Sequence, residues 1–193
     1  MAKTFIVETS ARHVHLSEAD FKVLFGENAS LTIKKPLSQP GQYVSTSRLD
    51  VVGPKKTIPG VSILGPTRDA DQVEVSLTDA RTLGVNAPIR ESGDTANSAP
   101  IILRNPENGK EISISEGCIV AKRHIHMTTK DAEVFGVKNG EIVNVVVNTK
   151  DRKTIFGDVV VRVKDSFGLA MHIDTDDANA VGFKNGSTVV PVK

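Results

Sequence analysis

The sequence has few of the residues that usually mark special environments. Its 193 residues include one cysteine, Cys118, one tyrosine and no tryptophan. A single cysteine excludes an intrachain disulfide bond, which is consistent with a reducing compartment. Cys118 lies outside the repeated unit described below, and we expect it to be a small buried apolar residue. No apolar run reaches membrane-spanning length, and the N-terminal stretch lacks the apolar core of a signal peptide.

A large net charge is also missing. The chain carries 24 Lys and Arg against 23 Asp and Glu, which gives a formal net charge of +1. This balance argues against the broad basic surface of a nucleic-acid-binding protein, although a few local Lys and Arg could hold a small polyanion. We expect a cytoplasmic homodimer with no nucleic-acid and no membrane partner.

Short runs of β-branched residues, separated by Gly and Pro, make up much of the chain. Examples are "VEV", "IVNVVV" and "DVVVRV", and the breaks include "VGPKK", "LGPT" and "RNPENGK". Several runs alternate with polar residues, as half-buried strands do. No long amphipathic helix is visible. The pattern predicts a mainly β fold, a barrel or sandwich of short strands.

One unit recurs four times along the chain. We call the first residue of each copy its head. An aspartate follows the head at plus five and a glycine at plus ten, or at plus eleven in the first copy. The four heads are His15, Glu74, His126 and His172. Two residues after the heads stand good helix N-caps: Ser17, Ser76, Thr128 and Asp174. We expect each unit to be a strand that ends at the head, then a capped helix of about two turns ended by a left-handed glycine, then another strand.

Four of the five histidines lie in two copies of one pattern, "ARHVHLS" and "KRHIHMT". Side chains at i and i+2 of a strand point to one face, so each His-x-His can hold one ion. The other two heads supply a third ligand each. Imidazole and carboxylate suit zinc, although cobalt or iron tolerates them too. The sequence therefore predicts two related metal sites, with the ligand sets His13, His15, Glu74 and His124, His126, His172.

Each part of this pattern also has an ordinary interpretation. A single His-x-His or Glu74 can belong to a plain strand, and His172 can be a core histidine. Arg68, in the turn "LGPTR", can be a solvated loop residue, or its planar guanidinium can hold a phosphate or carboxylate beside the metal. Ser92, in the polar turn "RESGD", can donate a hydrogen bond there. The fourfold repetition favours the metal sites.

The motifs taken together resemble a known family. The stretches "SARHVHLS", "GQYVS", "VGPK", "LGPTR", "QVEVSLTDAR", "RESGD", "KRHIHM" and "MHIDTDDANA" are similar to those of the zinc-dependent phosphate propanoyltransferases, the phosphotransacylases of bacterial microcompartments. The resemblance covers nearly the whole chain. It implies two small β-barrels with short capping helices, two zinc ions in the cleft between them, and interconversion of acyl-CoA plus phosphate with acyl phosphate plus CoA.

The resemblance also implies a division of the chain and of its residues. Residues 1–11 and 122–193 would form one barrel, and residues 12–121 the other. Arg68 would be the catalytic residue that holds phosphate. The remaining implied contacts are Gln42 and Ser92 to phosphate, and Thr9, Ser10, Ala11, Lys55 and Asn179 to CoA.

Two features depart from the family pattern. Ser62 stands where the resemblance implies an arginine that contacts CoA. The first strand starts almost at Met1, without the targeting extension of microcompartment members, so we expect a free cytoplasmic enzyme. Direct attack of zinc-held phosphate on the thioester is our hypothesis for the reaction. The alternatives are a dinuclear zinc hydrolase and a non-catalytic metal-binding barrel.

Overall fold

The fold is mainly β, as the sequence predicts. The computed structural model describes residues 4–147, 149–183 and 188–192; the parts of the predicted first barrel at residues 1–3, 148, 184–187 and 193 lie outside the described residues. Among the described residues, no helix is long and apolar enough to cross a membrane.

The chain divides into two compact units, which we name the barrel unit and the sheet unit. The barrel unit comprises the described parts of Met1–Ser10, Ser38–Pro40 and Lys122–Lys193, and the sheet unit comprises Ala11–Leu37 and Gly41–Ala121. The predicted domain boundaries at residues 11 and 122 stay a prediction. The sequence suggested no reason for Ser38–Pro40 to group with the barrel unit.

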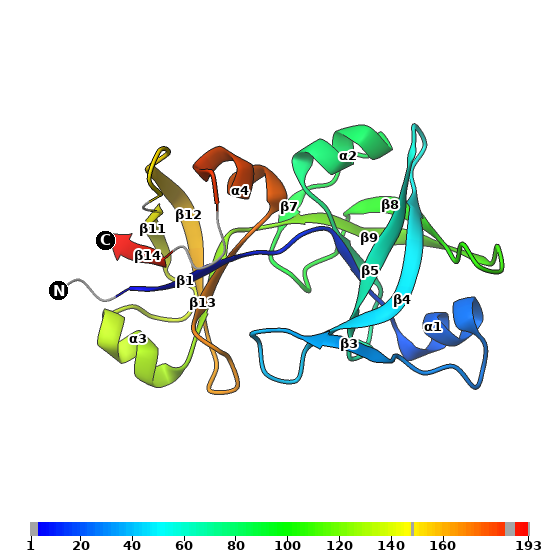
Figure 1. Ribbon diagram of the computed structural model, residues 1–193, viewed down its shortest axis with the longest axis horizontal. Coiled ribbons are helices and arrows are strands. Elements are labelled where there is room, and N and C mark those ends of the chain that lie inside the picture. Colours follow the sequence, from blue (N-terminus) through cyan, green and yellow to red (C-terminus); the bar gives the residue numbers. More distant parts are fainter. Residues whose placement is uncertain (1–3, 148, 184–187, 193) are drawn as a thin grey trace. The chain divides into compact units, whose positions relative to one another are not determined.

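The barrel unit is a closed barrel (Figure 1). In order around the barrel its strands are β1 (Phe5–Thr9), β13 (Ala170–Ile173), β10 (His124–Met127), β12 (Thr154–Val163), β11 (Ile142–Val147) and β14 (Thr188–Val192). The N-terminal strand β1, dark blue in Figure 1, runs parallel to β13 and antiparallel to β14. It therefore closes a barrel whose other strands lie between His124 and Val192 in the sequence.

The sheet unit contains a curled eight-stranded sheet. Its order is β3 (Ile33–Pro36), β4 (Tyr43–Val52), β5 (Thr57–Gly65), β2 (His13–His15), β6 (Gln72–Glu74), β9 (Glu111–Ala121) and β7 (Ile89–Arg90), while β8 (Ala99–Arg104) pairs with β4 and β9. Because β8 pairs with both β4 and β9, the pairing runs without a break through β4, β5, β2, β6, β9 and β8 and back to β4.

All four predicted helices are present, and each follows its predicted N-cap. The cap side chain accepts a hydrogen bond from the backbone N–H three residues on in every case, which contributes about 1 kcal/mol to helix stability. The helices are α1 (Glu18–Phe25), α2 (Leu77–Leu83), α3 (Thr129–Phe135) and α4 (Thr175–Val181).

The predicted left-handed glycines are confirmed at three of the four helix ends. Gly84, Gly136 and Gly182 adopt the left-handed conformation. Gly26 does not, because its φ is 106° and its ψ is 155°. Helix α1 has eight residues and the others have seven, so its end is rotated by about 100° relative to theirs and the chain leaves in another direction.

The two units repeat one strand register. In the sheet unit, His13 lies opposite Glu74 on β6 and Ser62 on β5. In the barrel unit, His124 lies opposite His172 on β13 and Val160 on β12. One strand pair is antiparallel and the other parallel in both units, so the repeat seen in the sequence is confirmed as a repeat of backbone pairing.

Each unit has its own apolar core. The sheet-unit core includes Val14, Ile63 and Val73, and the barrel core includes Ile125 and Met171. These residues alternate with the histidines and their neighbours, so the polar residues point to the other face of each strand. Cys118 is fully buried in the sheet-unit core, and burial raises the pKa of its thiol to about 12. The expectation of a small buried apolar residue is confirmed.

Candidate active site

Three predicted ligands meet in the sheet unit and form what we name the His13 cluster: His13, His15 and Glu74. One ligand atom from each side chain lies within 4.8 Å of the others. His13 Nε2 is 3.1 Å from His15 Nε2 and 3.5 Å from Glu74 Oε2. All three side chains are buried. The register of β2 and β6 places them together, because directly opposed strand residues share a face.

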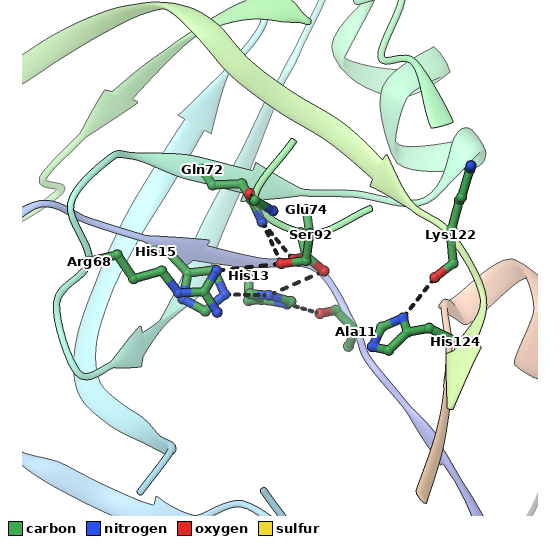
Figure 2. A network of polar contacts seen from close by, with 10 residues as sticks. Ala11, His13, His15, Arg68, Gln72, Glu74, Ser92, Lys122 and His124 are labelled. Atoms are coloured by element: carbon green, nitrogen blue, oxygen red, sulfur yellow. Dashed lines mark hydrogen bonds and ion pairs between the residues drawn. The ribbon is translucent and has the colours of Figure 1, made fainter. Parts of the chain in front are cut away.

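The backbone fixes which nitrogen of His13 faces the cluster. His13 Nδ1 lies 2.8 Å from the carbonyl oxygen of Ala11, seen as a dashed line in Figure 2. A carbonyl only accepts hydrogen bonds, so Nδ1 carries the hydrogen and Nε2 is directed at His15 and Glu74. His15 has a backbone partner of its own, Leu64.

A second layer of polar residues holds Glu74. Gln72 Nε2 donates to Glu74 Oε1 at 2.7 Å and to Ser92 Oγ at 3.0 Å, while the N–H of Gly93 donates to Gln72 Oε1 at 2.8 Å. Figure 2 shows Gln72 and Ser92 beside the Glu74 carboxylate. Gln72 was missed in the sequence. The spacing of "QVE" offered a signal, because Gln72 stands two residues before Glu74 and shares its face.

Arg68 lies beside this cluster, as predicted for a residue that holds an anion near a metal. Its N–H donates to the carbonyl of Leu16 at 2.8 Å, which ties the "LGPTR" turn to the strand end after His15. Its Nη1 is 3.4 Å from Ser92 Oγ. Figure 2 shows the guanidinium next to the ring of His15.

The charges of the His13 cluster shift the pKa of each member. Burial alone would raise the pKa of Glu74, but the charge of His13 and its hydrogen bond outweigh burial and hold that pKa far below its usual value. Burial, followed by the charges of His13 and Arg68, holds the pKa of His15 well below 6.5. Burial opposes protonation of His13 too, but Glu74 outweighs it and raises the pKa of His13. Glu74 is therefore a carboxylate and His15 a neutral imidazole at neutral pH.

The barrel unit holds the second predicted ligand set, the His124 cluster: His124, His126 and His172. Their ligand atoms also lie within 4.8 Å of one another. The rings of His124 and His172 stack with centroids 5.1 Å apart. His124 Nδ1 lies 2.8 Å from the carbonyl of Lys122, which repeats the contact between His13 and Ala11 (Figure 2).

Other residues of the barrel unit contact His172. Glu8 Oε2 lies 3.9 Å from His172 Nδ1, because Glu8 and His172 are paired in the register of β1 and β13. Gln39 Nε2 lies 3.4 Å from His172 Nε2. The Gln39 amide exchanges two hydrogen bonds with the backbone of Gly168, at 2.9 and 3.1 Å. Glu8 and Gln39 were missed in the sequence, because strand pairing and a distant loop bring them to His172.

The arginine before each His-x-His has a structural role that the sequence did not reveal. Arg12 binds Asp79 in the sheet unit, with N–O distances of 2.9 and 2.8 Å. Arg123 binds Asp177 in the barrel unit, with distances of 2.7 and 3.2 Å. Both aspartates stand at plus five in the repeated unit, so each arginine links its His-x-His strand to the helix that follows the third ligand.

Both clusters fit a metal ion by their own chemistry. Each offers three donors, two imidazoles with a carboxylate or three imidazoles, which is the donor set of a catalytic zinc site with an open position. In both His13 and His124, Nδ1 contacts a backbone carbonyl. Metal-binding histidines usually make a hydrogen bond of this kind through the nitrogen that does not bind the metal.

The other residues predicted to bind CoA or phosphate have varied surroundings. The Ala11 carbonyl contacts His13, and the N–H of Ser10, after Thr9 at the end of β1, donates to the carbonyl of Ile173 at 2.7 Å. Asn179 is exposed on α4. Within residues 4–147 and 149–183, no hydrogen bond or ion pair links the side chains of Gln42 or Lys55 to either cluster.

Comparison with known proteins agrees with this geometry. The family model described as phosphate propanoyltransferase matches residues 6–184. A phosphate propanoyltransferase of Sebaldella termitidis is 53% identical over 184 residues, which cover 95% of this chain and 86% of that protein. Phosphate propanoyltransferases of Alkaliphilus metalliredigens and Listeria monocytogenes are 50% and 53% identical, over 97% and 93% of this chain and 87% and 83% of theirs.

The chain belongs to the phosphate propanoyltransferase family. The resemblance seen in the motifs is thus confirmed, and the protein is an enzyme of the phosphate acyltransferase class. The family match spans both clusters and the Arg68 turn.

Proposed function

We propose that the enzyme transfers a short acyl group between CoA and inorganic phosphate, with one zinc ion at each cluster. The observation that supports this most is the arginine beside a buried ligand set: Arg68 lies next to the His13 cluster and contacts Ser92. A cation beside a three-donor metal site suits a substrate that carries several negative charges.

The reaction joins a phosphate oxygen to the thioester carbonyl carbon and breaks the carbon–sulfur bond, so that acyl phosphate and CoA thiolate are formed. Zinc ions at the clusters would supply Lewis-acid chemistry, which polarises a carbonyl, accepts a thiolate or offsets the charge of phosphate. Cys118, the one thiol of the chain, is buried with a pKa of about 12, so it is a poor nucleophile for an acyl-enzyme intermediate.

The residues of the sheet unit orient the attacking phosphate in this proposal. The Arg68 guanidinium binds two phosphate oxygens and lowers the cost of bringing an anion to a buried carboxylate. Gln72 and Ser92 keep Glu74 in position. Contacts of Gln42 and Ser92 with phosphate, and of Thr9, Ser10, Ala11, Lys55 and Asn179 with CoA, stay predictions.

One assay tests the function. Purified enzyme loaded with zinc is given acetyl-, propanoyl- or butanoyl-CoA, with and without phosphate, and thiol release and acyl phosphate are measured. We expect thiol release that requires phosphate, yields equal acyl phosphate, and is lost with a chelator and restored by zinc. Equal thiol release without phosphate would instead identify a hydrolase, and no release with any acyl-CoA would leave only a metal-binding barrel.

A further inference from the structure

A polar row crosses the sheet unit at the level of His13. Arg48 on β4 lies opposite Ser62 on β5, Ser62 lies opposite His13, and His13 lies opposite Glu74. Opposed residues share a face, so these four side chains lie on the same side of the sheet. The apolar core residues that flank them in sequence, such as Leu49 and Val61, occupy the other side.

Arg48 is a half-buried cation in this row. Its guanidinium donates a hydrogen bond to the hydroxyl of Ser62. In the part of the chain that the structure describes, no carboxylate forms an ion pair with Arg48. Asp50, two residues along β4, accepts the N–H of Gly60 at 2.9 Å instead. Partial burial of a charge costs free energy unless an anion offsets it.

The equivalent positions in the barrel unit show that the fold itself does not require this pair. There His124 lies opposite Val160, and Val160 lies opposite Ile142 on β11. Val160 is buried and Ile142 is exposed, so both positions accept apolar residues in the same register. The arginine and serine are thus specific to the unit that carries Arg68.

The distance from the His13 cluster is short enough for a shared substrate. Neighbouring strands lie about 4.8 Å apart, so a guanidinium held at Ser62 is one strand away from His13. Arg68 lies on the His15 side of the same cluster, where its backbone is bonded to Leu16. Two arginines therefore flank the ligand set, and both substrates of a phosphate acyltransferase carry phosphate groups.

We propose that Arg48, held by Ser62, is a second phosphate-binding residue of the sheet unit. This inference rests on the proposed function for the identity of the substrates. The phosphate group belongs either to orthophosphate, bound jointly with Arg68, or to CoA. The chemistry is the same in both cases, because a guanidinium binds phosphate oxygens through charge-assisted hydrogen bonds.

The test compares Arg48→Ala, Arg48→Gln, Arg48→Lys and Ser62→Ala with the control Arg104→Ala. Arg104 lies in the same sheet and pairs with Glu111 at the surface, so its loss removes an arginine without touching the row. Calorimetric titrations with CoA and with orthophosphate are run beside steady-state kinetics, together with zinc analysis and circular dichroism. Titration does not depend on turnover, so it tests Arg48 even if the proposed reaction fails in the wild type.

We expect Arg48→Ala to weaken one phosphate-bearing ligand roughly 10- to 100-fold in Kd and in KM. Arg48→Lys should recover part of this loss, Ser62→Ala should lose less, and Arg104→Ala should match the wild type. An acyl-pantetheine, which lacks phosphate, distinguishes the sources: the defect disappears with it if Arg48 binds CoA, and persists if Arg48 binds orthophosphate.

Two results would overturn the proposal. The first is a folded Arg48→Gln variant, with full zinc content, that binds both ligands like the wild type. This variant keeps a donor for Ser62 but not the charge, so it separates binding from packing. The second is loss of zinc or of structure in both Arg48→Ala and Arg48→Gln, which would show that Arg48 supports the fold.

Discussion

The His13 cluster and the His124 cluster occupy the same place in the same strand register, yet their surroundings differ. In each unit a His-x-His strand lies antiparallel to the strand of the third ligand, and the first histidine is held by a carbonyl two residues before it. The sheet unit has its carboxylate, Glu74, inside the cluster. The barrel unit has its carboxylate, Glu8, one strand further out.

The register shows how this difference arises. Glu74 is paired with Ile119 on β9, and its counterpart His172 is paired with Glu8 on β1. A carboxylate among the ligands lowers the net charge at the His13 cluster. Arg68 lies beside this cluster, and Arg48 lies in the same row of strand partners. The repeated backbone therefore places the ligands, while the residues around them differ between the two units.

Removal of one ligand from either cluster should have the largest effect. We expect His13→Ala and His124→Ala each to lose about one zinc equivalent and at least about a thousandfold in turnover, because a two-donor site holds zinc weakly and both ions are needed. Elemental analysis and the phosphate-dependent assay measure this, with Glu116→Gln as a surface control. If one of the two variants kept full activity, the clusters would not act together.

Arg68→Ala should come next, with a loss on the order of a hundredfold in turnover and a raised phosphate KM. Arg68→Lys should recover only part, because an ammonium keeps the charge but not the planar fork. Zinc content and CoA binding should stay as in the wild type, since other residues hold the metal. Kinetics at varied phosphate decide the matter; unchanged phosphate kinetics in Arg68→Ala would remove this residue from the site.

The ion pairs Arg12–Asp79 and Arg123–Asp177 should contribute different amounts to the free energy of unfolding. Arg123 makes both bonds to Asp177, donates to the Gly157 carbonyl at 3.1 Å and lies 4.7 Å from the Phe156 ring centroid. We expect Arg123→Ala to lower the free energy of unfolding by about 2–3 kcal/mol. Arg12→Ala should cost about 1–2 kcal/mol, because Arg12 is more exposed than Arg123, 43% against 35%.

Urea unfolding followed by far-UV circular dichroism measures both variants, because the chain has no tryptophan. The ranking would be wrong if Arg12→Ala proved the more damaging of the two.

Glu8→Gln should have a smaller and local effect. A carboxylate near the second nitrogen of a metal-binding histidine increases its basicity, and its loss typically lowers metal affinity about tenfold or more. We expect one of two zinc ions to be extracted more easily by a competing chelator, with the other unaffected. Identical extraction of both ions in Glu8→Gln and wild type would argue that Glu8 does not act on His172.

The features that belong to the repeated unit could be predicted from the sequence, whereas contacts that involve residues outside it could not. His-x-His spacing, head residues and N-caps recur at fixed intervals, so the strands, helices and ligand sets could be inferred from them. Asp79 lies 67 residues from Arg12, and Gln39 lies 133 residues from His172. No local pattern encodes such pairs, because strand order in the sheet brings them together.

The aspartates that cap the first helix of each unit offer the finest comparison. Asp71 Oδ1 accepts the N–H of Ser17 before α1 at 2.7 Å, and Asp165 Oδ1 accepts the N–H of Thr129 in α3 at 3.0 Å. Burial and a hydrogen bond with Asp20 raise the pKa of Asp71 to about 6. The hydrogen bonds from Thr129 lower the pKa of the exposed Asp165.

These opposite shifts predict opposite pH dependence. The protonated form of Asp71 is favoured by folding, so its contribution is present below the unfolded pKa of about 4 and is lost as the pH rises through about 6. Asp71→Asn keeps an acceptor for Ser17 and a donor for Asp20, and should stabilise the protein by about 1 kcal/mol at pH 7.5 and not at all at pH 4. That value is well below the full shift, because Asp71 is only partly buried and solvent screens its charge. The ionised form of Asp165 stabilises the folded state above the unfolded pKa of this group, and this stabilisation is lost as the pH falls. Asp165→Asn should therefore destabilise the protein at pH 7.5 only. Unfolding curves at both pH values, with Asp69→Asn as an exposed control, measure the two signs; a gain for Asp71→Asn that persisted at pH 4 would exclude ionisation as its cause.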